Sequence, residues 1–361
     1  MNVTACCFEG RARYELGADL AWMCRARRFF RDRGFVPADV SAYPVFSGFS
    51  RYSQLQEMSA SIISSWSFAY HGLYKVIGGC LCTVYFHTAK PVYVTIHRPA
   101  GMPHMPLAQL VDVLYDLCHG AELPFLQIRF IDETYLAEFK AIEGYHIEIQ
   151  RRPQDDEYVY RIKDLLELSG AANFYKRKRI KRCSALPGVS LRPLTRANVR
   201  ECLAVEDAWC QGKDCASCAS FGGCERDALR NMVDLFDEGR HLGLLLYQGE
   251  KSTGYVIAER VGPNLAFLYF GKAVMEGFFV YLIYHLFADP ENHARFDGLE
   301  YVNINEDMGS PGLRLFKSHL STYELWPKYI CTFTRDSGAF IERPRSTGAA
   351  IPFPLGRTPL P

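Results

Sequence analysis

Two carboxylates and two amides lie close together in the segment Asn303–Asp307. They follow residues typical of a buried strand, and they precede Ser310 and Pro311, a pair that suits the N-cap and the first position of a helix. The sequence therefore predicts a strand that ends in a polar cluster beside a helix N-terminus, where α/β folds often bind ligands. Glu306 and Asp307 could do acid–base chemistry there, or they could only complement the helix dipole.

Glu306 or Asp307 could take the proton of a bound acceptor, directly or through water. The residues leave open which carboxylate is the base. Lys272 or Arg314 would stabilise an oxyanion or a phosphate. The predicted substrate-binding residues are Asn303, Asn305, Lys272, Arg314 and Lys317.

The segment from Asn303 to Lys317 reads Asn-x-Asn-Glu-Asp-x-Gly-x-x-Gly-Leu-Arg-x-x-Lys. This pattern resembles the signature of the phosphatidylglycerol lysyltransferase C-terminal domain family, in its stand-alone soluble members. Further similar blocks are Tyr158-Val159-Tyr160, Asp164-Leu165, Leu168-Ser169-Gly170, Tyr175-Lys176-Arg177-Lys178 and Gly271-Lys272-Ala273. Lys178 replaces a family Asn, and Gly271 replaces a family Glu. The resemblance covers roughly Tyr43 to Arg335.

The resemblance implies an α/β (α+β) fold of two tandem GNAT-like domains, each a twisted mixed β-sheet flanked by helices. It also implies relatives that move an aminoacyl group from aminoacyl-tRNA to an amine or hydroxyl, such as a small-molecule or peptide amine. The mechanism that this resemblance implies is acyl transfer without a covalent intermediate, in which the acceptor loses its proton to Glu306 or Asp307 and attacks an activated ester. Two other functions remain open, namely a non-catalytic module that binds RNA or an amino compound, and an acetyl-CoA-dependent N-acetyltransferase. The segment Gly271–Gly277 lacks the spacing of a pyrophosphate-binding loop, and Glu276 would repel pyrophosphate. We therefore expect an acyl donor other than acetyl-CoA.

The densest run of positive charge begins with Lys176, Arg177, Lys178 and Arg179. Such a run could bind the phosphates of a tRNA acceptor stem, and the resemblance strengthens that interpretation. The alternative is an exposed basic helix that is only solvated. Both interpretations place these side chains on a helix surface.

Four cysteines, Cys210, Cys215, Cys218 and Cys224, fall within one short stretch. Thiolates this close together could bind zinc or an iron–sulfur cluster. The stretch contains a single Cys-x-x-Cys, and its other spacings match no standard zinc motif. Unligated thiols on a loop are therefore the alternative.

The elements that must position these groups follow from hydrophobic periodicity. We expect an N-terminal extension at 1–42, a first domain at 43–155, a second domain with the active site at 156–335 and a disordered tail at 336–361. The chief strands and helices expected are Leu73–Ile77, Cys80–His87, Leu107–Leu117, Leu126–Ile131, Val189–Pro193, Leu242–Gln248, Ser252–Glu259, Leu265–Phe270, Gly277–Phe287, Leu299–Asn303, Pro311–Leu320 and, in the second domain, Tyr329–Arg335.

The composition limits which partners and which cellular compartment can be expected. The 361 residues carry 41 Lys and Arg against 40 Asp and Glu, so any attraction to nucleic acid must come from a local patch. The sequence contains 13 cysteines, with no secretory signal pattern and no membrane span predicted. We therefore expect a soluble, cytoplasmic protein whose cysteines are reduced.

Overall fold

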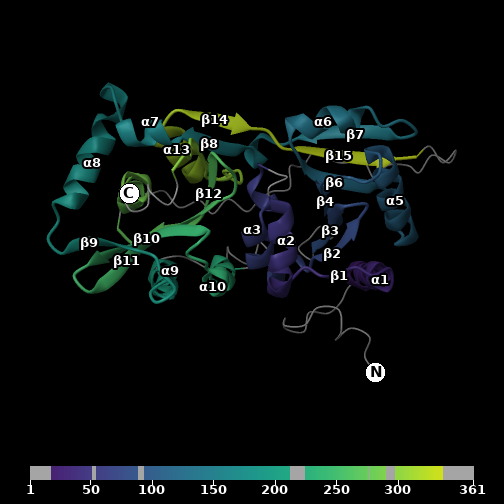
Figure 1. The fold of residues 1–361 in the computed structure, drawn as a ribbon, viewed down its shortest axis with the longest axis horizontal. Coiled ribbons are helices and arrows are strands. Elements are labelled where there is room, and N and C mark those ends of the chain that lie inside the picture. The colour runs from purple at the N-terminus through teal and green to yellow at the C-terminus, as the bar shows by residue number, and fades with distance from the viewer. Residues whose placement is uncertain are drawn as a thin grey trace. The chain divides into compact units, whose positions relative to one another are not determined.

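The computed structural model describes residues 18–50, 54–87, 93–211, 224–275, 277–289 and 297–335 (Figure 1). These residues form two compact units. Unit 1 contains the described residues up to Pro153 together with the segment from Pro327, and unit 2 contains those from Gln154 to Trp326. Each unit is a mixed sheet flanked by helices, so the predicted fold of two tandem GNAT-like domains is confirmed.

The sheet of unit 1 contains one parallel pair of strands. Its order is β1 (Val36–Pro37), β2 (Leu73–Ile77), β3 (Cys80–His87), β4 (Tyr93–His97), β6 (Leu126–Ile131), β15 (Tyr329–Thr334) and β7 (His146–Arg151), and β5 (Ala100–Gly101) pairs with β3. Strands β4 and β6 are parallel, and the other recorded pairs are antiparallel. Strand β5 and then helix α5 (Leu107–Gly120) lie between β4 and β6 in the chain.

Helices cover both faces of this sheet (Figure 1). On one face, α1 (Ala18–Asp32), α5 and α6 (Glu133–Lys140) share one apolar cluster with Cys82, Val84 and Phe86 of β3. On the other, α2 (Tyr43–Phe49) and α3 (Ala60–Ser65) pack on Leu81, followed by α4 (Ser67–Tyr70). The short turns η1 (Val40–Ala42), η3 (Gln56–Met58) and η4 (Pro153–Asp155) complete this part of the chain.

The described part of the expected N-terminal extension belongs to the core of unit 1. Met23, Ala26 and Phe30 of α1 are buried in the apolar cluster that includes strand β3. These residues are spaced by three and four, so they form one apolar stripe on a helix whose arginines occupy the other faces. Residues 1–17, and the expected tail at 336–361, lie outside the described residues.

The sheet of unit 2 also contains one parallel pair. Its order is β14 (Tyr323–Trp326), β8 (Glu157–Arg161), β13 (Tyr301–Asn303), β12 (Leu265–Ala273), β11 (Lys251–Arg260), β10 (His241–Gln248) and β9 (Val189–Pro193). Strands β12 and β13 are parallel and are connected through α11 (Phe278–Ala288). Helices α7 (Ile162–Glu167), α8 (Phe174–Ser184, preceded by the turn η5, Ala171–Asn173) and α11 cover one face, and α9 (Glu201–Gln211) with α10 (Glu225–Leu235) packs on the other. Helix α13 (Pro311–Leu320) follows β13.

Strand β15 is not where the sequence analysis placed it. It was expected in the second domain, but it lies between β6 and β7 in the sheet of unit 1, with Cys331 and Phe333 in that core. Alternating apolar residues identify a strand but not its pairing partner, and β15 is joined to its neighbours only by long-range contacts. The edge strand β14 was not predicted. None of the described helices is long and apolar enough to span a membrane.

A loop held by buried charges at the end of a parallel strand pair

The candidate site lies where β12 and β13 separate. Their ladder runs from the pair Leu265–Tyr301 to the pair Phe267–Asn303, and β12 then continues to Ala273 paired with β11 and no longer with β13. Beyond Asn303 the chain stays hydrogen-bonded to β8 instead, because Ile304 N donates to Tyr158 O and Tyr158 N donates to Asn305 O. The segment after β13 is thus held from one side, at the carboxyl end of a parallel strand, as the sequence predicted.

The loop that follows β13 has an unusual backbone. Asn305 (φ 65°), Met308 (φ 51°) and Gly309 (φ 73°) all lie in the left-handed region, which only glycine adopts without cost. Ser310 then caps α13 by accepting a hydrogen bond from Leu313 N, and Pro311 occupies the first helical turn. The predicted cap is confirmed, and the strained loop before it must be stabilised by its surroundings.

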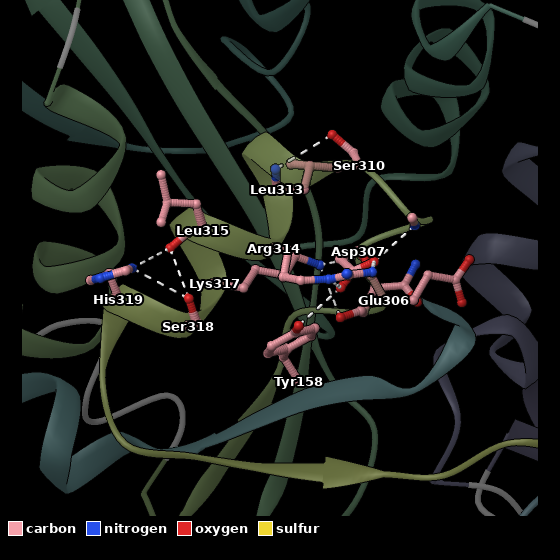
Figure 2. A network of polar contacts seen from close by, with 12 residues as sticks. Tyr158, Glu306, Asp307, Ser310, Leu313, Arg314, Leu315, Lys317, Ser318 and His319 are labelled. Atoms are coloured by element: carbon pink, nitrogen blue, oxygen red, sulfur yellow. Dashed lines mark hydrogen bonds and ion pairs between the residues drawn. The ribbon is translucent and has the colours of Figure 1, made fainter. Parts of the chain in front are cut away.

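Asp307 supplies much of that stabilisation (Figure 2). Its carboxylate is 2% exposed and accepts hydrogen bonds from Tyr158 Oη (3.0 Å), Gly309 N (2.8 Å), and Nε and Nη2 of Arg314 (2.8 and 3.2 Å). Burial alone would raise the pKa of the Asp307 carboxyl, but the hydrogen bonds from Arg314, Gly309 and Tyr158 outweigh it and hold the pKa below its ordinary value. Asp307 is therefore a fixed anion that anchors the loop to α13 and β8.

Lys317 holds the same loop from the helix side. Its buried ammonium donates to three consecutive backbone carbonyls, those of Ile304 (2.6 Å), Asn305 (2.9 Å) and Glu306 (2.6 Å). Tyr160 Oη in turn donates to the carbonyl of Lys317 at 2.7 Å. The three N–H donors of Lys317 thus stabilise the loop backbone.

Asn303 is also committed to the scaffold. It is fully buried, its Nδ2 donates to Glu157 Oε2, and its Oδ1 accepts from Asn305 N at 2.8 Å. The amide side chain therefore closes a turn at the end of β13. Of the residues that the sequence singled out here, Asn303, Asp307, Arg314 and Lys317 form one structural network.

The network of Asn303, Asp307, Arg314 and Lys317 fixes the backbone of the loop that carries Asn305 and Glu306. The Asn305 Oδ1 atom is enclosed and has no hydrogen-bond partner among the described residues, and its backbone is in the left-handed region. Glu306 is half-buried, and its side chain is directed away from the Asp307–Arg314 pair (Figure 2). Strain and an unused polar atom at one residue are typical of functional sites.

Lys272 belongs to a second polar cluster, at the end of β12. Its Nζ donates to Glu225 Oε2 (2.7 Å) and lies 4.5 Å from the centre of the Trp209 ring. Burial lowers the pKa of Lys272, but Glu225 and Glu206 outweigh it and raise the pKa above its ordinary value. Buried Glu206 accepts from Tyr255 Oη at 2.8 Å, and burial raises its pKa.

The sequence analysis found Lys272 but none of its partners. Trp209 and Glu206 come from α9, Glu225 from α10 and Tyr255 from β11. Apart from the i, i+3 spacing of Glu206 and Trp209, no local pattern connects them. Packing of α9 and α10 on the sheet is what brings them together.

The basic run forms helix α8, and only part of it is exposed for binding. Lys176 Nζ donates to Asn173 Oδ1 (2.6 Å), and Arg177 donates to the carbonyls of Leu168 and Gly170, so these two stabilise the turn before the helix. Lys178 and Arg179 are exposed.

The aromatic residues at the start of α8 are exposed as well. The exposed fraction is 53% for Phe174 and 78% for Tyr175. At the other end of the exposed face, the Arg179 side chain lies against Gly277, where a Cβ atom would be 2.7 Å from its Cδ. Helix α8 therefore presents both cations and aromatic rings.

Two of the four cysteines considered as metal ligands, Cys215 and Cys218, lie outside the described residues. Cys210 and Cys224 are half-buried and form no disulfide. Within the described ranges, no group of three or more His, Cys, Asp or Glu residues has the geometry to hold a metal ion.

A family model described as "Phosphatidylglycerol lysyltransferase, C-terminal" matches residues 49–332. A conserved protein of unknown function from Bacteroides thetaiotaomicron has the same fold, with a TM-score of 0.73 and 21% identity over 83% of this chain and 99% of that one. The C-terminal domain of a putative lysylphosphatidylglycerol synthetase from Agrobacterium fabrum matches with a TM-score of 0.53 and 14% identity, over 87% of this chain and 92% of that one. L-PGS from Bacillus licheniformis matches with a TM-score of 0.51 and 14% identity, over 86% of this chain and 91% of that one. A search of curated proteins gave no significant match.

Proposed function

This chain belongs to the phosphatidylglycerol lysyltransferase, C-terminal family, and we propose that it transfers an aminoacyl group from an aminoacyl-tRNA to an amine or hydroxyl acceptor. Family membership and the shared fold of the lysylphosphatidylglycerol synthetase domains support acyl transfer. The observation that carries the proposal is the network around Asp307, which holds Asn305 and Glu306 in a strained loop at the end of β13.

In this proposal Glu306 is the general base and Asp307 is its anchor. A base needs a lone pair that can reach the proton of the acceptor. The oxygens of Asp307 already accept four hydrogen bonds, and its pKa is lowered, so it is a poor proton acceptor near neutral pH. Glu306 lies next to it on the same fixed backbone, and the amide of Asn305 is assigned to bind the acceptor or the aminoacyl group.

The reaction then balances without a covalent enzyme intermediate. The acceptor N–H or O–H gives its proton to Glu306 while its lone pair attacks the ester carbonyl. The new amide or ester bond forms, the bond from the carbonyl carbon to the tRNA ribose oxygen breaks, and that oxygen takes the proton from Glu306, which is thereby returned to its carboxylate form. Lys272 remains cationic beside Glu225 and is assigned to stabilise the developing oxyanion or a donor phosphate.

Helix α8 is assigned to the tRNA donor. Exposed Lys178 and Arg179 supply charge for phosphates, and exposed Phe174 and Tyr175 supply flat surfaces on which unpaired bases can stack. A single-stranded acceptor end offers both kinds of group. Lys176 and Arg177 contribute charge, but their hydrogen bonds to Asn173, Leu168 and Gly170 fix them to the protein.

The test is consumption of total aminoacylated tRNA in the presence of a pool of amino acids, short peptides and polyamines. We expect the wild-type protein to accelerate loss of the ester with formation of a new amide, and Glu306→Gln to be slower by at least 100-fold. Glu306→Asp should retain more activity than Glu306→Gln. The control is Lys163→Gln, at an exposed position of α7, which should not change the rate.

Three results would contradict this assignment. Full activity in Glu306→Gln would exclude Glu306 as the base. Binding of tRNA without ester loss would indicate a non-catalytic module. Stabilisation by acetyl-CoA with transfer of its acetyl group would indicate an N-acetyltransferase.

A further inference from the structure

Strand β15 completes the sheet of unit 1, although the chain reaches it only after the whole of unit 2. It lies between β6 and β7 and is antiparallel to both (Figure 1). Among the described strands, β7 pairs with β15 alone, so β7 would be unpaired without it. Cys331 and Phe333 of β15 are fully buried in the core of unit 1. The sheet of unit 1 therefore stays incomplete until β15 is inserted.

Polar contacts hold both ends of β15 in unit 1. Before the strand, buried Lys328 is ion-paired with Glu57. After it, Nη2 of Arg335 donates to Asp112 Oδ1 (2.6 Å) and to Tyr145 Oη (2.7 Å). Strand β15 is therefore held at its ends by charged side chains and in its middle by apolar packing.

Unit 2 has no such dependence on a distant segment. Its described sheet is built from one stretch of the chain, from β8 to β14. Strands β10, β11 and β12 pair with their neighbours in sequence, through antiparallel ladders that need only short turns. Local pairings form faster than pairings between distant segments. These three strands can therefore form before β15 is inserted.

Folding of unit 2 also shortens the connection that β15 must close. Strands β7 and β15 pair across as many as 188 positions of the chain. Once unit 2 has formed, Trp326 lies opposite Glu157, and only residues 152–156 and 327–328 separate this pair from β7 and β15. The entropic cost of closing a loop rises with its length, so a connection of about 7 residues in place of about 180 favours insertion of β15 by roughly 100-fold.

We propose that β15 is a strap that closes unit 1 only after unit 2 has folded. A chain whose unit 2 is unfolded then leaves β7 without a partner and the apolar core of unit 1 open. Completion of unit 1 thus depends on unit 2 during folding. This order of assembly does not depend on transfer activity, and it holds for a catalytic and a non-catalytic protein alike.

The order is tested by refolding the full-length protein from urea with pulsed hydrogen exchange. Amides of β10, β11 and β12 should become protected before those of β6, β7 and β15. Protection of β15 together with these unit 2 strands, or before them, would overturn the proposed order.

A flexible insertion distinguishes the two orders by their loop lengths. A Gly/Ser segment of about 20 residues between Trp326 and Pro327 lengthens the short connection, and it should slow protection of β15 by roughly 7-fold if unit 2 has already folded. The matched control is the same segment between Ser169 and Gly170, at an exposed position of unit 2. It should not slow β15 beyond any delay of β10, β11 and β12, because a folded unit 2 takes it out of the connection.

The opposite order predicts a different result for the same two variants. If β15 were inserted first, both segments would lengthen a connection of about 180 residues equally, and each would slow β15 by less than about 1.2-fold. Equal effects of the two insertions on β15 would therefore overturn the proposal.

Discussion

The two parallel strand pairs of the molecule, β4–β6 in unit 1 and β12–β13 in unit 2, have the same connection through a helix and very different polar chemistry. After β13, polar side chains satisfy one another, with four hydrogen bonds to Asp307 and three from Lys317. At the end of β4, by contrast, His97 is buried and its Nδ1 has no hydrogen-bond partner among the described residues. One repeated framework thus supports a loop fixed by hydrogen bonds in one place and a buried histidine with an unsatisfied ring nitrogen in the other.

The largest expected effect is the loss of the anion that holds the unit 2 loop. Asp307→Ala leaves the Tyr158 hydroxyl, Gly309 N and the Arg314 guanidinium without their acceptor. Because Arg314 is half-exposed and regains water, we expect a loss of about 3 kcal/mol in the free energy of unfolding, at the lower end for a broken buried pair. Urea titration measures it. Glu306→Ala is the control and should cost less than about 0.5 kcal/mol.

If Asp307→Ala lowered the free energy of unfolding as little as Glu306→Ala, the comparison between the two parallel strand pairs would lose its basis. It would mean that the loop is not held by its buried charges. The functional assignment of Glu306 would then lose its structural argument, whatever the activity of the variants.

Replacing the buried cation of the same network should cost somewhat less. Lys317→Met keeps the aliphatic packing but leaves the carbonyls of Ile304, Asn305 and Glu306 without a donor. We expect a loss of about 2 kcal/mol, since the carbonyls can recover water when the loop relaxes. Lys163→Met, at an exposed position of α7, should change stability by less than about 0.5 kcal/mol in the same titration.

The sequence predicted most elements of both frameworks and misplaced one strand. The ranges Cys80–His87 and Leu126–Ile131 agree with β3 and β6, because alternation of apolar residues is a local signal. Strand β15 was assigned to the wrong sheet because pairing depends on residues far away in the chain. The edge strand β14 was missed, since most of its side chains are exposed and its sequence shows no buried face.

The sequence predicted the position of the candidate site, but not which of its side chains hold the loop and which are held by it. The pattern of amides and carboxylates at Asn303–Asp307 marked the correct strand end, and Ser310 marked the correct helix start. What the sequence did not contain is the partner set of Asp307, because Tyr158 is 149 positions away. No sequence motif marks the buried position of His97 at the end of β4.

On acidification, the β4–β6 region of unit 1 and the β12–β13 region of unit 2 should lose stability at different pH values. His87 has its pKa lowered from 6.5 to about 3, by burial and by Arg129, and that of His97 is lowered in the same direction. The unfolded chain therefore binds more protons below pH 6.5, and this contribution to stability is lost as the pH falls from there. The pKa of Asp307 is lowered from 3.8, so its contribution is lost only below that value.

Hydrogen exchange at several pH values measures this difference, after correction for the intrinsic rates. Amides of β3 and β4 should lose more protection between pH 6.5 and 5 than those of β12 and β13, although burial also lowers the pKa of His241 and of His285 in unit 2. His97→Gln should reduce the loss in β4. Simultaneous loss of protection in both sheets would show that the two regions do not respond separately to protonation.

The smallest expected effect distinguishes strain from function within the unit 2 loop. Asn305→Gly and Met308→Gly both place glycine where φ is positive, so each should raise the free energy of unfolding by up to about 1 kcal/mol. Only Asn305→Gly removes the amide oxygen that has no hydrogen-bond partner among the described residues. We therefore expect Asn305→Gly to be stabilised and to lose transfer activity, and Met308→Gly to be stabilised with activity unchanged. Equal activity in both variants would mean that Asn305 is strained for a reason other than binding.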